Sequence, residues 1–550
     1  PFSSGVYTWW HWMNGNITKD GITCDLEAMK ANGIAGYQLF EAGSGIPIGP
    51  VESLSDEWVD LILHTLKESE RLGLEFAMHN CPGWSSSGGP WITPDKAMQI
   101  ITWSETKVTG GKQIRMPLPT PKHMFDYYID TFCLAIPANM EVIPKSSVLE
   151  LSGQLKDGVL TWAAPAGEWL IIRFGQTAKD QKNKSAPSKS TGLDCDKFST
   201  EALDYHLDCM FKRLMPAMEK VAKHSKIGLL IDSYETGDQD WTSDMPAYFE
   251  QKHRYALYPF LPALANKVVE SEESTKRFLF DFRRTRADLF AERYYAHFQK
   301  RCKEKGIITY TEPYGGNMME ELQVAQQLDI NMGEFWCGQT VLWANYKYNR
   351  TVKQVASIAH TLGGKIVGAE AFTSEPDADK WLLYPYALKS LGDYMFTRGL
   401  SRIYFHRFAH QPHPTAAPGM TMGAWGLHFD RTNTWWKPGK AWIDYLNRCQ
   451  HIFQSSTFYG DILYHNGDDS FGSTIEPEQT PLAPPEGYDY DMVNTEILDK
   501  AHIKDGKILL PATRFDGYKL LVLLKSETMS LHTLRILARL VGEGMVLVGQ

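Results

Sequence analysis

The sequence has few cysteines and no closely spaced cysteine pair. Its eight cysteines are scattered along 550 residues, and no two of them form a C-x-x-C motif. A structural zinc site needs ligands at short, regular spacing, so the sequence predicts no zinc site. In a chain of this size, scattered cysteines are typical of buried free thiols rather than of a disulfide framework.

A clustered basic region and a long apolar run are also missing. The formal net charge of -9 is spread along the chain, which argues against a nucleic-acid partner. No run of residues is long enough to cross a bilayer, so no membrane span is predicted. No G-x-S-x-G elbow, P-loop or dinucleotide fingerprint occurs between a predicted strand and a predicted helix, which argues against serine hydrolase, nucleotide and NAD chemistry.

The chain begins at Pro1 and carries neither an initiating methionine nor a signal peptide. We expect that an export signal has been removed and that the protein is periplasmic or extracellular.

Aromatic residues are abundant, with 17 Trp and 25 Tyr. Indole and phenol rings suit the C–H faces of sugar rings, but they also fill large cores. Composition leaves these two interpretations open.

Four short apolar runs each end in a glutamate. The first is Lys226–Glu235, and similar runs end at Glu312, Glu334 and Glu370. Uninterrupted apolar runs are typical of strands in parallel sheets that helices cover on both faces. In a barrel of alternating strands and helices the strand C-termini meet on one face, so these carboxylates are expected in one pocket.

Four further segments complete a count of eight strands: Val6–Met13, Ile34–Glu41, Leu74–Asn80 and Arg402–Arg407. Helical patterns between them begin at Thr18, Ser55 and Ser199. The predicted fold class is therefore α/β, a (β/α)₈ TIM-like barrel with an inserted all-β domain and a truncated C-terminal βαβ (Rossmann-like) region. A polar stretch, residues 178–190, is expected to be a mobile loop.

Changes in residue pattern and composition along the sequence divide the chain into four parts. Short alternating segments with proline and glycine turns indicate the all-β insertion, and the last residues read as strand, helix and strand before the sheet is complete. The predicted domains are residues 1–101 (barrel, first three strands), 102–190 (inserted β-rich domain), 191–455 (remaining barrel) and 456–550 (partial α/β accessory domain).

Glu235 and Glu370 are the candidate catalytic pair, because they follow strands four and seven on opposite sides of the predicted barrel mouth. Glycoside hydrolysis needs one protonated and one ionised carboxyl group, and their separation distinguishes inverting from retaining enzymes. Any single glutamate at a strand end is more often a salt-bridge partner, but four converging carboxylates repel one another unless a cation or shared protons relieve them.

Glu312 and Glu334 are the candidate metal ligands, supplemented by Asp232 or Asn331. Carboxylate and amide oxygens are the ligands that calcium prefers. A hydrogen-bonded acid network without metal is the alternative.

Polar and aromatic side chains at successive strand ends are candidate hydroxyl ligands for a sugar. These are Trp10, His11, Asn14, His79, Asn80, Trp84, Asp232, Tyr234, His406, His410 and Trp425.

The opening motif Trp9–Thr18, with Gly33–Gly36, His79–Trp84, Asp232–Glu235 and Gly368–Glu370, resembles glycoside hydrolase family 106, the α-L-rhamnosidases. The resemblance covers essentially the whole predicted barrel. It implies a calcium-dependent, inverting, exo-acting hydrolase of plant pectic polysaccharides or oligosaccharides such as rhamnogalacturonans. It further implies Glu370 as general acid, Glu235 as general base, and Glu334 and Glu312 as metal ligands.

Other functions stay open on the sequence alone. A retaining glycosidase of another sugar specificity could use the same two glutamates, and a non-catalytic carbohydrate-binding protein would bind sugar without hydrolysis. A metal-dependent lyase or aldolase is disfavoured, since no lysine stands beside the acids at a strand end. The sequence does not predict an oligomeric state.

Overall fold

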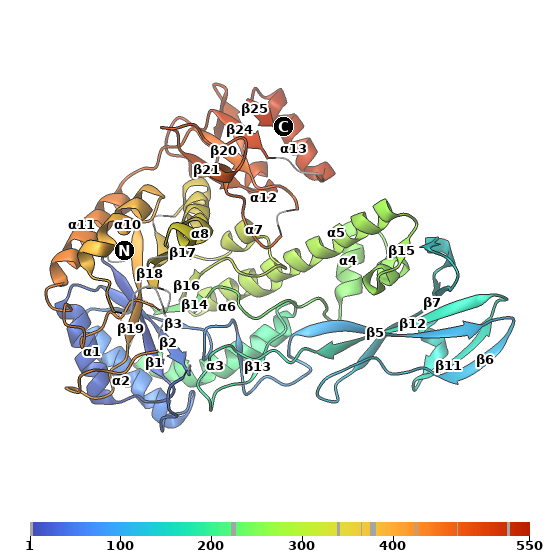
Figure 1. Ribbon diagram of the computed structural model, residues 1–550, viewed down its shortest axis with the longest axis horizontal. Coiled ribbons are helices and arrows are strands. Elements are labelled where there is room, and N and C mark those ends of the chain that lie inside the picture. Colours follow the sequence, from blue (N-terminus) through green and yellow to red (C-terminus); the bar gives the residue numbers. More distant parts are fainter. Residues whose placement is uncertain are drawn as a thin grey trace.

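The computed structural model describes residues 4–43, 45–221, 227–337, 341–364, 366–374, 381–423, 426–469, 471–524 and 528–549. Its centre is a closed barrel of parallel strands in the order β1-β19-β18-β17-β16-β14-β3-β2 (Figure 1), which confirms the predicted eight-stranded barrel. The strands are β1 (Tyr7–Met13), β2 (Gly36–Ala42), β3 (Glu75–His79), β14 (Ile227–Ile231), β16 (Ile308–Thr311), β17 (Ile330–Cys337), β18 (Val367–Ser374) and β19 (Arg402–Ala409).

Helices surround the barrel and follow the capping signals of the sequence. Thr18 accepts a hydrogen bond from the Gly21 amide at the start of α1 (Lys19–Ala31), and Ser55 caps α2 (Asp56–Leu72). Gly73 ends α2 with φ 64°, a left-handed conformation that favours glycine. The barrel is also covered by α3 (Thr200–Val221), α8 (Val341–Leu362), α10 (Pro385–Thr397) and α11 (Lys440–Ser455).

The alternating direction of side chains along β1 determines which aromatic side chains lie inside the barrel. Tyr7 and Trp9 pack inside it with Phe40 and other side chains of the neighbouring strands. Trp10 and Trp12 belong instead to the core between the strands and the outer helices. Successive side chains of a strand point to opposite faces, so Trp9 and Trp10 cannot share a pocket.

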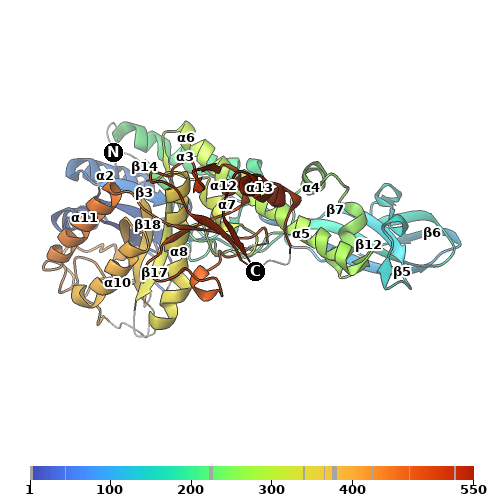
Figure 2. The same cartoon turned by 90° about the horizontal axis from the view of Figure 1, so that it is seen from above.

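Antiparallel sheets lie between β3 and α3 in the chain. One has the order β5-β12-β7-β9 and another the order β10-β11-β6, where β9 is Leu149–Glu150 and β10 is Leu155–Lys156. Both extend away from the barrel (Figures 1 and 2). Their longer strands are β5 (Gln99–Thr109), β6 (Lys112–Pro117), β7 (Ile129–Pro137), β11 (Val159–Ala164) and β12 (Glu168–Ala178). The predicted limits of this and the other domains stay predictions.

The helical segment over residues 272–304 is interrupted. It consists of α5 (Glu272–Leu289), a π-helical turn over Phe290–Ala296, and α6 (His297–Glu304). Figure 1 shows α5 running from the barrel towards the antiparallel sheets.

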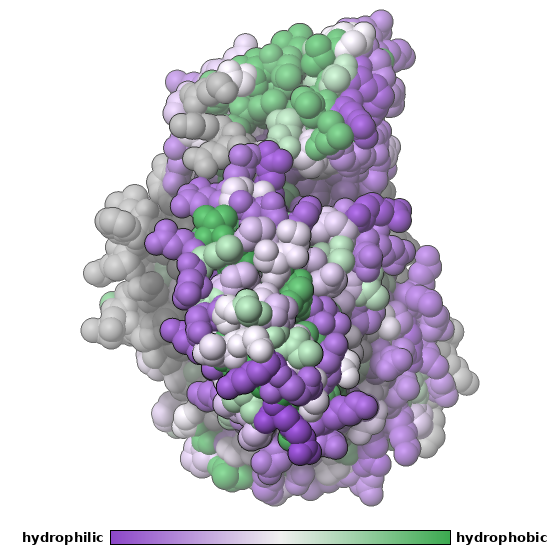
Figure 3. Space-filling model, turned by 90° about the vertical axis from the view of Figure 1, so that its right-hand side faces the viewer, coloured by the Kyte–Doolittle hydropathy of each residue, from purple (hydrophilic) through white to green (hydrophobic). Residues whose placement is uncertain are grey.

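The C-terminal region contains a sheet of four parallel strands, β21-β20-β24-β25, and the predicted truncation of this region stays a prediction. The strands β20 (Ile462–His465) and β21 (Tyr490–Val493) precede the predicted strand, helix and strand of the last residues. Between β24 (Leu520–Leu523) and β25 (Leu547–Gly549) runs α13 (Leu531–Gly542). Figure 3 shows an apolar patch over this end of the molecule, formed by exposed side chains such as Leu531, Leu534, Val541 and Val546.

No helix in the described ranges combines the length and the apolar character that a membrane crossing requires.

Candidate active site

Four carboxylates of the barrel meet at its mouth. Glu334 and Glu370 are register partners on β17 and β18, Glu312 follows β16 directly, and Asp232 follows β14. The prediction that the strands end at Glu334 and Glu370 is wrong, because β17 and β18 continue beyond these residues. Both side chains therefore stand on rigid strands and not on loops.

Asp232 and Glu312 form a buried pair of carboxyl groups. They are 3% and 0% exposed, and the two carboxyl groups interact electrostatically. Burial raises the pKa of both groups well above the ordinary range, and repulsion from the other acids raises it further. Glu312 Oε2 accepts a 2.6 Å hydrogen bond from Tyr314, whereas its buried Oε1 has no partner among the described residues.

Glu370 lies in a similarly dry position, beside β19. Burial raises the pKa of its carboxyl well above the ordinary range, and the charges of Glu334, Asp232 and Glu235 add to this. Thr373 donates a hydrogen bond to Glu370 Oε1, and His406 Nδ1 lies 3.3 Å from the same oxygen. Phe372 forms a β-bulge in β18, because it has no register partner on β17 and its φ is 62°. Such a bulge changes the direction of the side chains that follow it.

Glu235 occupies a different environment. Its side chain is 40% exposed, and Oε2 accepts hydrogen bonds from Lys184 Nζ at 2.6 Å and from the Trp84 indole at 3.2 Å. Trp84 and Lys184 are joined through their backbones, since the Trp84 amide donates to the Lys184 carbonyl. The stretch expected to be a mobile loop thus supplies the cation that faces Glu235.

Rings line the barrel interior below the acids. His11 and His79 each stack on Phe40 with centroids 5.2 Å apart, and His406 lies edge-on to Trp9 at 5.1 Å. Burial lowers the pKa of His79 to about 4 and that of His11 well below its usual range, so both imidazoles are neutral at pH 7. Within the described structure, His11 Nδ1, His79 Nε2 and Trp9 Nε1 are buried without a hydrogen-bond partner. Unpaired polar atoms of this kind suit hydroxyl ligands.

Two predicted sugar ligands lie outside this pocket. Trp10 Nε1 donates to Asp25 Oδ2 at 3.1 Å, and His410 Nδ1 lies 2.8 Å from the same oxygen. Arg431 completes the cluster with a 2.7 Å bond to Asp25 Oδ1. Trp10 and His410 are buried in this cluster against α1, because their side chains point to the outer face of the barrel.

Other predicted residues have polar atoms that local structure already uses. Asn14 bonds the Ile46 carbonyl and the Ser188 amide, Asn80 bonds the Leu230 carbonyl and Ser87, and the Tyr234 hydroxyl donates to the Gly237 carbonyl. Asn331, considered as a metal ligand, donates to the Ala325 carbonyl on the outer side of β17. Trp425 lies outside the described residues.

Sequence reasoning missed Trp9, Lys184 and Thr373. Trp9 could have been found from the alternation of β1, since it shares a face with His11. No sequence pattern indicated Lys184 or Thr373, because a contact of a distant loop brings Lys184 to the site and a β-bulge brings Thr373 there.

The acids suit a hard cation in their chemistry. Calcium binds carboxylate oxygens. Glu312 Oε1, which is buried and has no hydrogen-bond partner among the described residues, is an oxygen that could bind such a cation near the Asp232 carboxyl. The described side chains do not by themselves form a group of three or more His, Cys, Asp or Glu placed to hold a metal ion. Asp232, Glu312 and Glu334, whose charges act on one another, are the residues that would hold calcium.

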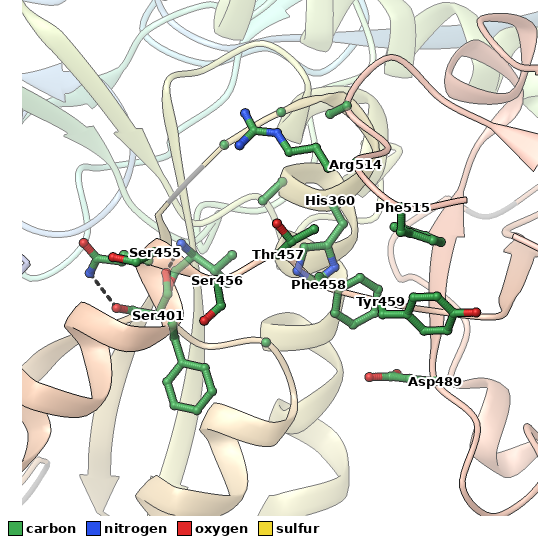
Figure 4. Close-up of a pocket in the computed structure, with 18 of the residues that line it drawn as sticks. His360, Ser401, Ser455, Ser456, Thr457, Phe458, Tyr459, Asp489, Arg514 and Phe515 are labelled. Atoms are coloured by element: carbon green, nitrogen blue, oxygen red, sulfur yellow. Dashed lines mark hydrogen bonds between the residues drawn. The ribbon is translucent and has the colours of Figure 1, made fainter. Parts of the chain in front are cut away.

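A separate cavity of about 440 Å³ lies near the opposite end of the barrel, beside the C-terminal sheet (Figure 4). Its lining includes His360, Phe458, Tyr459, Arg514 and Phe515, and none of the predicted site residues.

Comparison with known proteins agrees with this geometry. A protein from Formosa agariphila named "Putative beta-glucuronidase" is 39% identical over 582 residues, which cover 100% of this chain and 49% of that protein. The chain thus spans about half the length of this relative.

A rhamnosidase structure from Novosphingobium sp. PP1Y matches with TM-score 0.90 and 25% identity, covering 100% of this chain and 69% of that one. A β-galactosidase from Bacillus circulans sp. alkalophilus matches with TM-score 0.55 and 9% identity, over 100% of this chain and 71% of that one, and shares the fold alone. The family model described as alpha-L-rhamnosidase, glycoside hydrolase 106, matches residues 1–131 and 122–550. The chain belongs to glycoside hydrolase family 106, the alpha-L-rhamnosidase family.

Proposed function

We propose that this chain carries the active site of an exo-acting α-L-rhamnosidase that hydrolyses terminal α-L-rhamnosyl linkages with inversion. The observation that supports this most is the contrast between two carboxyl groups at one barrel mouth. Glu370 is buried and favours its protonated form, whereas Glu235 is partly exposed and faces an ammonium group. Acid and base roles in one site require environments that differ in this way.

In the proposed reaction Glu370 gives its proton to the glycosidic oxygen while the bond from C1 to that oxygen breaks. Glu235, as carboxylate, takes a proton from a water molecule whose oxygen bonds to C1 from the opposite face. Lys184 and Trp84 hold Glu235 Oε2 in place. Inversion leaves Glu235 protonated and Glu370 ionised, and one proton transfer through solvent restores the starting state.

Calcium is proposed at the remaining acids. When bound, it would supply charge that neutralises them and a ligand site for the cis hydroxyl pair at C2 and C3 of rhamnose. Asp232, Glu312 and Glu334 would hold it. The neutral imidazoles of His11 and His79 offer hydrogen bonds to sugar hydroxyls without adding charge.

The wider setting is also a proposal. The substrate class is a plant pectic glycan of rhamnogalacturonan type, and the location is periplasmic or extracellular. The antiparallel sheets of the predicted 102–190 domain and the C-terminal α/β region are proposed as accessory domains.

One relative's name favours a second candidate, a β-glucuronidase that uses the same pair of carboxylates. The deciding experiment compares hydrolysis of aryl α-L-rhamnosides and aryl β-D-glucuronides by the purified protein, with calcium and with chelator. We expect release of the phenol from the rhamnosides alone, at a rate that the chelator reduces. Release from the glucuronides alone would replace the proposed substrate, and equal rates with chelator would remove calcium from the proposal.

A further inference from the structure

An exposed tryptophan stands at the rim of the barrel mouth, backed by a second ring. Trp381 is 61% exposed, and its ring lies parallel to that of His428 at a centroid distance of 3.7 Å and an angle of 4°. One face of the indole is therefore covered by the imidazole, and much of the ring remains open to solvent.

The ring beneath Trp381 is fixed. His428 is 6% exposed, and its Nδ1 lies 3.1 Å from Thr421 Oγ1. Burial and the charge of Arg407 lower the pKa of His428 to about 3, so the imidazole is neutral at pH 7. A rigid, uncharged support of this kind holds the indole in one orientation.

A continuous series of contacts joins Trp381 to Glu370. The segment of His428 pairs with β19, since the Leu427 amide donates to the His406 carbonyl at 2.7 Å. A Cβ atom on Gly426 would lie 2.9 Å from His406 Nδ1, so this backbone packs directly on the imidazole. His406 in turn lies 3.3 Å from Glu370 Oε1. Trp381 thus stands on the Glu370 side of the mouth, where the leaving group is protonated.

The backbone of Trp381 is unusual for a bulky residue. Its φ of 63° lies in the left-handed region that favours glycine. Strained backbone of this kind is typical of positions where a side chain is held for a function.

We propose that Trp381 is a stacking platform for the first sugar of the leaving group, the pyranose ring to which the rhamnosyl residue is attached. This inference rests on the proposed function. The C–H face of a pyranose suits an open indole face, and the position beside the proposed general acid suits the aglycone rather than the rhamnose itself.

The test compares two substrates, methyl α-L-rhamnopyranoside, which has no second ring, and a rhamnosyl-hexose disaccharide. For Trp381→Ala we expect kcat/KM on the disaccharide to fall by about tenfold to thirtyfold, mainly through KM. Hydrolysis of the methyl glycoside should stay within about twofold of the parent, and Trp381→Phe should recover part of the loss.

Tyr459→Ala is the matched control. Tyr459 is also an exposed aromatic residue, 50% exposed and packed on Phe515 at 5.1 Å, but it lines the distant cavity of Figure 4. The Tyr459→Ala substitution should leave kcat/KM for both substrates unchanged.

The possible failures are distinct. If the parent protein hydrolyses neither rhamnoside, the proposed function fails. If it hydrolyses both but Trp381→Ala affects them equally or not at all, the platform is refuted. A loss on the disaccharide in Tyr459→Ala but not in Trp381→Ala would also refute it, since it would place the second sugar in the other cavity.

Discussion

Replacement of Glu370 by glutamine tests the division of roles between the two carboxylates. The substitution removes the proton that the buried carboxyl would deliver, while the amide keeps nearly the same shape beside Thr373 and His406. General acid catalysis contributes about 10²- to 10⁴-fold in rate, equivalent to roughly 3–5 kcal/mol of transition-state stabilisation.

The size of the loss should depend on the leaving group. A substrate with a poor leaving group, such as a rhamnosyl disaccharide, should lose the full factor. An aryl rhamnoside with a strongly acidic phenol needs little protonation and should lose about tenfold or less. The assay is kcat/KM for a series of aryl α-L-rhamnosides of graded phenol pKa, with Glu235→Gln as the companion variant.

Glu235→Gln should slow all members of the series alike, because activation of water does not depend on the leaving group. The glutamine variant of Glu370 should unfold at the parent's temperature or above it, since burial already favours a neutral group there. An equal loss for all leaving groups in Glu370→Gln, or a graded loss in Glu235→Gln, would refute the assignment.

Two further predictions concern stability. Asp25→Ala should destabilise the protein by about 3–5 kcal/mol in denaturant unfolding, because it leaves Arg431 and His410 without their buried partner; a loss below about 1 kcal/mol would contradict this account. Folding raises the pKa of Asp232 and Glu312, so stability in chelator should be greatest at acid pH and fall as pH rises from about 4 through the raised values. Glu312→Gln should flatten this dependence and calcium should oppose it, as thermal unfolding at pH 5 and pH 8 can measure; equal pH profiles in the parent and the variant would contradict the acid pair.

The barrel could be predicted from the sequence because its signals are local. Apolar runs such as Ile227–Ile231, separated by capped helices, mark strands and their connections without any knowledge of neighbours. The strands β20 and β21 carried a weaker signal, since each is only four residues long and lies among glycine, proline and acidic residues.

The site was only partly predictable, since its details depend on contacts between distant segments. Glu370 and Glu235 could be proposed from their positions after apolar runs. Nothing local pairs His410 with Asp25, which is 385 residues away in the chain. Trp10 lies on the outer face of the barrel, as the alternating direction of side chains along β1 requires. The cluster of aromatic residues in this strand made that alternation hard to recognise.

The most direct test of the proposed mechanism is proton NMR of the first sugar released from an α-L-rhamnoside. Inversion by Glu370 as acid and Glu235 as base predicts that β-L-rhamnose appears first and that the α-anomer accumulates only by mutarotation. If α-L-rhamnose appears first, one of the two carboxylates acts as a nucleophile, and the proposed inverting mechanism is wrong.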